Sequence, residues 1–137
     1  MNKRTLKMMI CDMNDRFSHQ LSSLLSQVDF IDLIGNTRTY SETSCLLHFM
    51  EPDVILMDIS ALPDGYPGAI HFIRKQHPGV KVVALTMFNN EIERNDLTRY
   101  GFDASISRVN DLDQITDELK KVYRNHTPVR AKKMVAA

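Results

Sequence analysis

Short apolar runs alternate along this chain with segments in which apolar residues recur every three or four positions. Five of the short runs are typical of buried β-strands, and they span residues 6–11, 31–36, 53–59, 81–87 and 104–108. Each run is followed by the spacing of an amphipathic helix, which predicts helices over 15–28, 39–50, 69–76, 90–100 and 112–122. Strict alternation of strand and helix predicts a parallel sheet with helices on both of its faces.

These elements predict an α/β fold, doubly wound around a five-stranded parallel sheet, and we assume for it the flavodoxin-like (βα)5 strand order 2-1-3-4-5. We place segment 104–108 at an edge of the sheet because its residues alternate between apolar and polar. Residues 1–125 would form this single domain. Residues 126–137 show no apolar periodicity, and we interpret them as a C-terminal tail or the stub of a linker.

Composition and charge narrow the function. The 17 basic and 17 acidic side chains cancel, so no electrostatic footprint favours nucleic acid or an anionic membrane. The longest apolar run is far short of a membrane span. Cys11 and Cys45 have no metal-binding spacing, and two thiols are no disulfide framework. We therefore expect a cytoplasmic protein that binds neither nucleic acid nor membrane directly through this domain.

Polar side chains stand where four of the predicted strands end. Asp12 follows the first strand, Asp58 and Thr86 lie near the ends of the third and fourth, and Arg108 ends the fifth. In the order 2-1-3-4-5, the first and third strands flank the switch point at which ligands bind, so Asp12 and Asp58 would face each other there. Two simpler interpretations stay open: Asp12 caps the next helix, and Thr86 is an ordinary strand residue.

From about residue 6 to 125, the chain resembles a CheY-like receiver domain of bacterial two-component response regulators, particularly the LuxR type. The sequence PDVILMDI resembles the strand that carries the phosphoacceptor, and VVALTM the strand that carries a switch hydroxyl. GFDASISR has the spacing of the segment that ends in the family's lysine, and HPGVK resembles the loop before the fourth strand.

The resemblance implies a role for each polar residue. Asp58 would be the phosphoacceptor, Thr86 the switch hydroxyl, and Arg108 would stand at the lysine position. Mg²⁺ would be held by Asp12, Asp58 and the backbone carbonyl of Ser60. The implied partners are a sensor histidine kinase or phosphotransfer protein, together with a downstream protein or an effector domain. These partners would read the face formed by helix 4, strand 5 and helix 5.

Three residues depart from the family pattern. Met13 occupies the position of a second acid, Arg108 that of the lysine, and Ser105 that of an aromatic switch residue. A thioether is no ligand for Mg²⁺, so we expect weak metal binding. The planar guanidinium of Arg108 can bind a carboxylate through two hydrogen bonds, so we expect Arg108 to pair with Asp58 and fill the phosphoryl site.

Three functions compete at this point. The first is a signal-transduction receiver that accepts or senses a phosphoryl group at Asp58, in a phosphorelay. The second is a pseudo-receiver that binds its partner independently of phosphate, and a homodimer is compatible with either. The third is a flavodoxin-like enzyme or nucleotide binder, which is weakest because no Gly-rich phosphate loop follows any strand. We therefore do not expect an enzyme.

Overall fold

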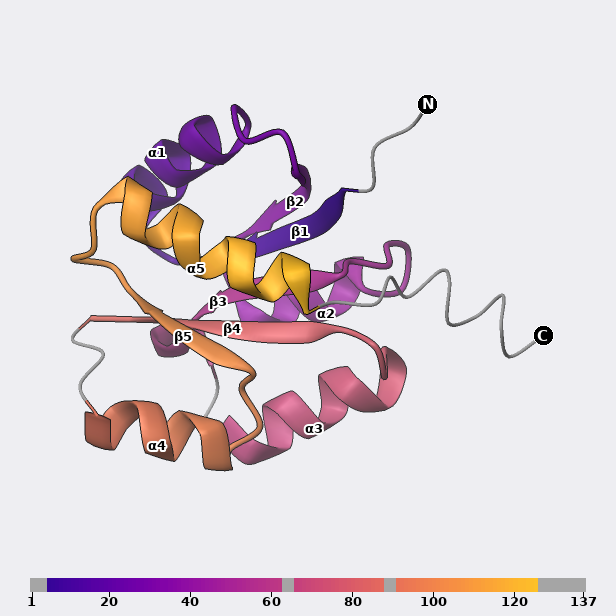
Figure 1. Cartoon of the computed structure of the whole chain (residues 1–137). Coiled ribbons are helices and arrows are strands. Elements are labelled where there is room, and N and C mark those ends of the chain that lie inside the picture. Colours follow the sequence, from indigo (N-terminus) through magenta and orange to yellow (C-terminus); the bar gives the residue numbers. More distant parts are fainter. Residues whose placement is uncertain (1–4, 63–65, 88–90, 126–137) are drawn as a thin grey trace.

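The structure, a computed structural model, describes residues 5–62, 66–87 and 91–125 and shows the predicted alternation of strands and helices (Figure 1). The strands are β1 (Leu6–Cys11), β2 (Ile31–Thr37), β3 (Val54–Asp58), β4 (Lys81–Thr86) and β5 (Ala104–Ser107). The helices are α1 (Asp15–Leu25), α2 (Tyr40–Leu46), α3 (Tyr66–Gln76), α4 (Glu91–Arg99) and α5 (Leu112–Arg124), with a short 3-10 turn over Ile59–Ala61. The predicted tail, 126–137, lies outside the described residues.

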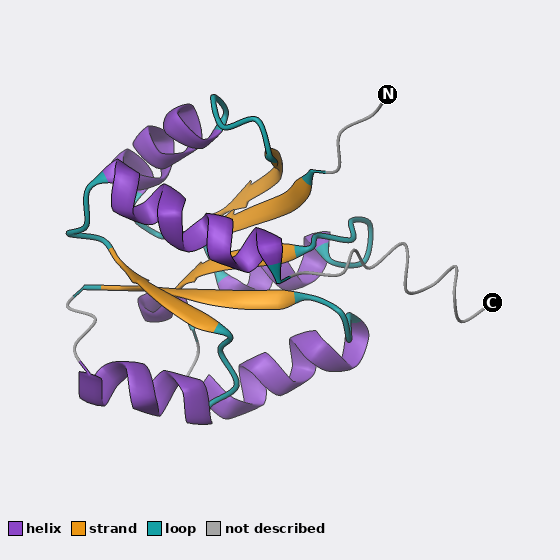
Figure 2. Cartoon of the chain, viewed as in Figure 1, coloured by secondary structure: helices purple, strands orange, loops and turns teal. Residues whose placement is uncertain are grey.

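The five strands form one parallel sheet in the order β2-β1-β3-β4-β5. This confirms the predicted fold class and the edge position of β5. Figure 2 shows the three layers: α1 and α5 cover one face of the sheet, and α2, α3 and α4 cover the other. The carboxyl ends of all five strands therefore meet at one edge, where the polar residues of the sequence analysis lie.

Alternate residues of each strand supply two separate cores. On β1, Met8 and Ile10 pack towards α1 and α5, whereas Met9 and Cys11 pack towards the helices on the opposite face. Both faces of the sheet are buried, which explains why the central strands are nearly continuous apolar runs rather than alternating ones.

Local capping fixes where the helices begin and end. Asn14 caps α1, and Asp111 caps α5 in a capping box with Gln114. Gly101 follows α4 with a φ of 102°, which glycine adopts without strain. The helix predicted over 39–50 is shorter: α2 ends at Leu46, and the backbone N–H groups of His48 and Phe49 then donate to carbonyls three residues back.

Candidate functional site

The four strand-end residues come together at the carboxyl edge of the sheet. Asp12 is completely buried after β1, and Asp58 and Thr86 are buried at the ends of β3 and β4. Arg108 follows β5, and its backbone N–H donates to the carbonyl of Thr86 at 2.8 Å. The prediction that these side chains share one edge is therefore confirmed.

Arg108 binds both carboxylates. Its Nη1 donates to Asp12 Oδ2 at 2.9 Å and its Nη2 to Asp12 Oδ1 at 2.5 Å. The same Nη2 lies 2.9 Å from Asp58 Oδ2. The expected pair with Asp58 thus forms, but the two-pronged contact is with Asp12. Two carboxylates and one guanidinium leave a formal charge of −1 in a site where the Arg108 side chain is only 11% exposed.

Hydrogen bonds and charge favour the ionised forms of Asp58 and Arg108. Burial tends to raise the pKa of Asp58, but the hydrogen bonds from Ser60 and the charge of Arg108 outweigh it, so that this pKa lies below its usual value. Burial tends to lower the pKa of Arg108, but the bonds to Asp12 and the charges of both acids raise it above its usual value. The site at neutral pH is therefore a buried ionic cluster.

Residues in the loops that follow β3 and β1 donate hydrogen bonds to Asp58 and Asp12. The backbone N–H of Ser60 donates to Asp58 Oδ1 at 3.0 Å, and the Ser60 hydroxyl donates to Asp58 Oδ2 at 2.7 Å. The backbone N–H of Asn14 donates to Asp12 Oδ1 at 3.0 Å. Asn14, not Asp12, caps the next helix, so the simpler interpretation of Asp12 is wrong.

The side chains present do not fit a tightly held Mg²⁺. Both oxygens of each acid accept hydrogen bonds or ion pairs from protein groups. Met13 is 49% exposed in the turn after β1 and supplies a thioether, and Asp15 pairs with Arg38 at 3.0 Å at the start of α1. Among the described residues, no group of three or more His, Cys, Asp or Glu is arranged to hold a metal ion.

Thr86 shows a different feature of the site. Its hydroxyl is buried and makes no hydrogen bond within the described part of the structure. An unsatisfied buried hydroxyl costs about 1–3 kcal/mol. A buried hydroxyl without a protein partner calls for an explanation, such as a functional role or a partner from outside the chain.

An aromatic ring completes the site, and our sequence analysis missed it. The Arg108 guanidinium carbon lies 4.6 Å from the centre of the Phe17 ring, on the first turn of α1. Apolar periodicity assigns Phe17 to the buried face of the helix, but it does not reveal which group the ring covers. Ser105, at the predicted aromatic position, lies half-buried on β5 opposite Ala84 and has no ring.

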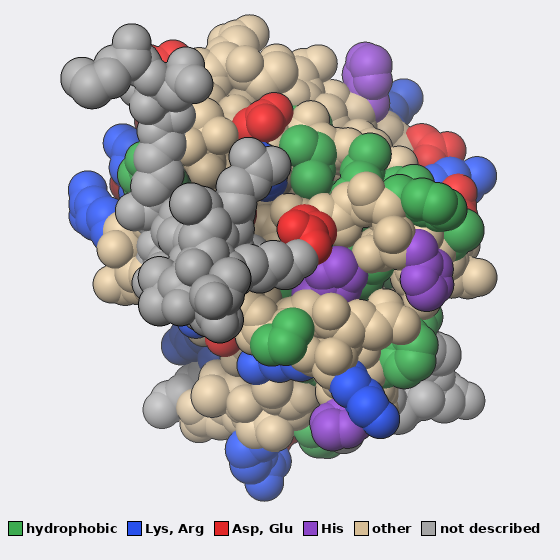
Figure 3. Space-filling model, turned by 90° about the vertical axis from the view of Figure 1, so that its right-hand side faces the viewer, with side chains coloured by type: hydrophobic (Ala, Val, Ile, Leu, Met, Phe, Trp, Pro, Cys, Tyr) green, Lys and Arg blue, Asp and Glu red, His purple; other side chains and the backbone are tan. Residues whose placement is uncertain are grey.

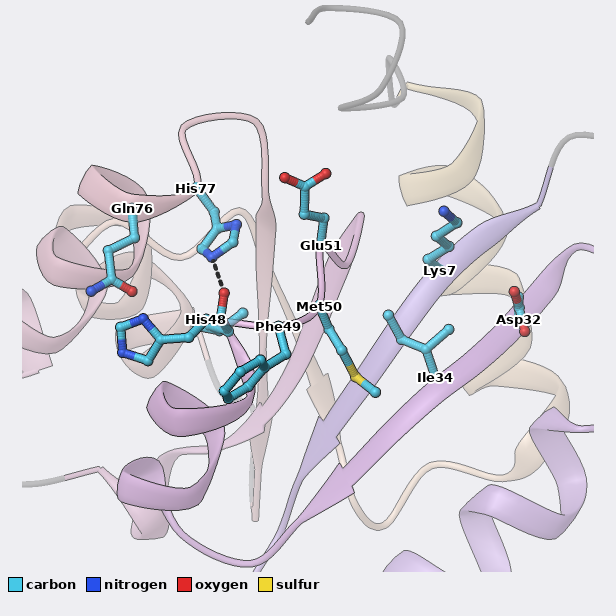
Figure 4. A pocket seen from close by; sticks show the side chains of 10 residues that line it. Lys7, Asp32, Ile34, His48, Phe49, Met50, Glu51, Gln76 and His77 are labelled. Carbon is cyan, nitrogen blue, oxygen red and sulfur yellow. Dashed lines mark hydrogen bonds between the residues drawn. The ribbon is translucent and has the colours of Figure 1, made fainter.

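A groove at the opposite end of the sheet is separate from this site. It lies between the connection from α2 to β3 and the starts of β1 and β2 (Figure 4). Its lining includes Ile34, Phe49 and His77, and His77 Nε2 lies 2.8 Å from the carbonyl of Leu47. Figure 3 shows the side of the molecule that lies on the right in Figure 1, and hydrophobic and histidine side chains are prominent on it. The groove contains none of the strand-end residues.

Comparisons with known proteins agree with the fold and the sequence pattern. No family model matches the chain. The response regulator protein VraR of Staphylococcus saprophyticus is 30% identical over 135 residues, which cover 95% of this chain and 62% of that relative. The chain spans about three fifths of the length of the curated relatives that it matches. In the described residues, no helix is long and apolar enough to cross a bilayer.

Solved structures show the same architecture. The isolated REC domain of RcsB from Salmonella enterica serovar Typhimurium, in the presence of the phosphomimetic BeF3−, has a TM-score of 0.78 at 16% identity, covering 91% of this chain and 93% of that one. A LuxR-family two-component response regulator from Aurantimonas sp. SI85-9A1 has a TM-score of 0.79 at 15% identity, covering 89% and 87%. In sequence pattern and fold together, this chain resembles the receiver domains of the two-component response regulators, particularly those of the LuxR type.

Proposed function

We propose that this receiver domain acts as a regulatory interaction module whose signal does not depend on a phosphoryl group at Asp58. The observation that carries the proposal is the contact of Arg108 with both acids. The guanidinium supplies the positive charge that a divalent cation would supply in a metal-dependent receiver. It also occupies the space beside Asp58 in which a phosphoryl group would have to bind.

The proposal includes weak binding of Mg²⁺. A cation at this site would have to displace Arg108 from two buried carboxylates, and Met13 offers it no oxygen in return. Asp12, Asp58 and the Ser60 carbonyl would remain its only ligands from the protein among the residues assigned to the site.

We propose the α4–β5–α5 face as the surface that partners read. Exposed apolar side chains lie on or beside these elements: Met87, directly after β4, is 54% exposed, Ile92 on α4 is 76% exposed, and Val109, directly after β5, is 72% exposed. Contiguous exposed apolar area is typical of protein–protein contacts. One partner would be a sensor histidine kinase or a phosphotransfer protein. The other would be a downstream protein or an effector region, since the matched relatives are longer than this chain.

A second candidate function is an ordinary phosphorylated receiver, and one observation favours it. The buried hydroxyl of Thr86 has no partner, and an oxygen of a phosphoryl group on Asp58 would supply one. In that case Arg108 would leave Asp58 and bind the phosphoryl oxygens instead.

Backbone amide spectra separate these two candidates. ¹H–¹⁵N spectra of the wild-type domain are recorded before and after acetyl phosphate with Mg²⁺, and Asp58→Asn serves as the control for effects of the reagents. We expect the two wild-type spectra to coincide, because Arg108 keeps the site closed. Shifts across α4, β5 and α5 that are absent in Asp58→Asn would support the second candidate and contradict the first.

A further inference from the structure

The ring of Phe17 covers a face of the guanidinium whose edge binds the two acids. The ring centre lies 4.6 Å from Arg108 Cζ, within the range of a cation–π contact. The carboxylates of Asp12 and Asp58 take the N–H groups that point outward in the guanidinium plane. The cation is therefore held in two directions, by charge along its edge and by an aromatic ring on its face.

This position of Phe17 follows from how α1 begins. Asn14 caps the helix by accepting a hydrogen bond from the Phe17 N–H at 3.0 Å, and the Asn14 N–H donates to Asp12. The ring also packs against the core beneath α1 and α5. A short chain of contacts thus runs from Asp12 through Asn14 to Phe17 and returns through Arg108 to Asp12.

We infer that Phe17 is a positioning residue that holds Arg108 on Asp12 and Asp58, and that it couples the closed site to the first turn of α1. The inference rests on the proposed function, since it explains what keeps the guanidinium in place of a cation. Ser105 on β5 has no ring, and the aromatic contact with Arg108 comes from Phe17 on α1 instead. Displacing Arg108 would therefore remove one of the contacts that the first turn of α1 makes.

Nitrogen-15 spectra of the Arg108 side chain test the positioning directly. Wild type, Phe17→Leu and Phe17→Tyr are compared, and the Arg108 signals are assigned by their loss in Arg108→Lys. In wild type we expect separate Nη signals, because the guanidinium cannot rotate, and proton shifts displaced by the ring current of Phe17. Phe17→Leu should merge or broaden these signals, whereas Phe17→Tyr should keep them. Arg108 signals in Phe17→Leu that match the wild type would overturn the inference.

A packing control separates this effect from general destabilisation. Leu25→Val removes one methylene from the same core at the far end of α1. We expect it to leave the Arg108 side-chain signals unchanged, whereas Phe17→Leu should merge or broaden them. Equal changes in the two variants would mean that Phe17 only fills the core.

Calorimetric titration with Mg²⁺ gives a second measurement. In the background of Met13→Asp, Phe17→Leu should tighten Mg²⁺ binding by about 2- to 30-fold, the factor that corresponds to the loss of a cation–π contact. Unchanged affinity would overturn the positioning role. The proposed function has a different failing result: wild type would bind Mg²⁺ tightly and respond to acetyl phosphate. In that case the Arg108 signals would still show whether Phe17 positions the guanidinium.

Discussion

Arg108 determines the electrostatics of this site because it binds two buried acids at once. A lysine at this position would offer a compact charge without the planar set of donors that meets both oxygens of Asp12. Removing one member of a buried ionic cluster leaves the other charges buried without a partner. The resulting loss of folding free energy is larger than the net stabilisation that the intact cluster provides. The consequence is that Asp12 and Asp58 depend on Arg108 for charge compensation.

Arg108→Ala should therefore destabilise the fold by about 3–5 kcal/mol, because Asp12 and Asp58 would remain buried without a positive partner. Denaturant unfolding of the two proteins measures the difference. Arg99→Ala is the matched control: Arg99 pairs with Asp96 on the exposed surface of α4, and its loss should cost at most about 1 kcal/mol. Equal losses in the two variants would show that the buried cluster contributes nothing special.

Met13→Asp should strengthen Mg²⁺ binding, because it restores a hard oxygen ligand beside Asp12 at a position that is already half-exposed. Calorimetry on wild type and variant provides the comparison, with Met87→Asp as a control for added negative charge at another exposed methionine. Tight binding already in wild type, equal to that of the variant, would refute the weak-metal proposal.

The helices differ in how firmly the core holds them. On α5, Ile115 and Leu119 are buried and a capping box fixes the first turn. Among the described side chains of α4, one apolar residue, Leu97, is buried, and Ile92 is largely exposed. An element with so little buried apolar area belongs to the less stable part of a fold, where binding surfaces are often found.

Amides of α4 should consequently exchange with solvent faster than those of α1 and α5. Hydrogen exchange followed by mass spectrometry resolves the three helices, and α1 serves as an internal reference because Leu21 and Leu25 anchor it. Protection of α4 as strong as that of α5 would argue against a mobile partner face.

Much of this element-level picture can be predicted from the sequence, because two periodicities and a few caps specify it. The carboxyl ends of parallel strands must meet at one edge, so Asp12, Asp58 and Thr86 can be brought together without coordinates. The principal pairing of Arg108 cannot be predicted in this way, because it depends on how far a side chain reaches across two intervening strands. The contact between the Phe17 ring and Arg108 cannot be predicted for the same reason. Periodicity predicts that Phe17 lies on the buried face of its helix, but not which side chain it contacts.

At the scale of the whole molecule, the domain has two separate ends. The carboxyl ends of the strands carry the ionic cluster, and the amino ends carry the groove beside Phe49 and His77 (Figure 4). The sheet between them is buried on both faces, so its core supplies the stability of the domain.

Deleting residues 126–137 should leave the melting temperature almost unchanged. This segment shows no apolar periodicity in its sequence, and the domain proposed from the sequence ends at residue 125. Thermal unfolding of the full chain and of the 1–125 chain, followed by circular dichroism, is the measurement. A decrease of many degrees would show that the domain boundary is wrong.

The central claim is that Arg108 closes the site against a phosphoryl group, and intact-mass analysis during incubation with acetyl phosphate and Mg²⁺ tests it most directly. Wild type is compared with the double variant Met13→Asp, Arg108→Lys, and each is also made with Asp58→Asn to confirm where the phosphoryl group binds. The account predicts that the double variant gains one phosphoryl mass at Asp58 while wild type gains little or none. A wild-type protein that gains the full phosphoryl mass at the rate of the double variant would contradict it.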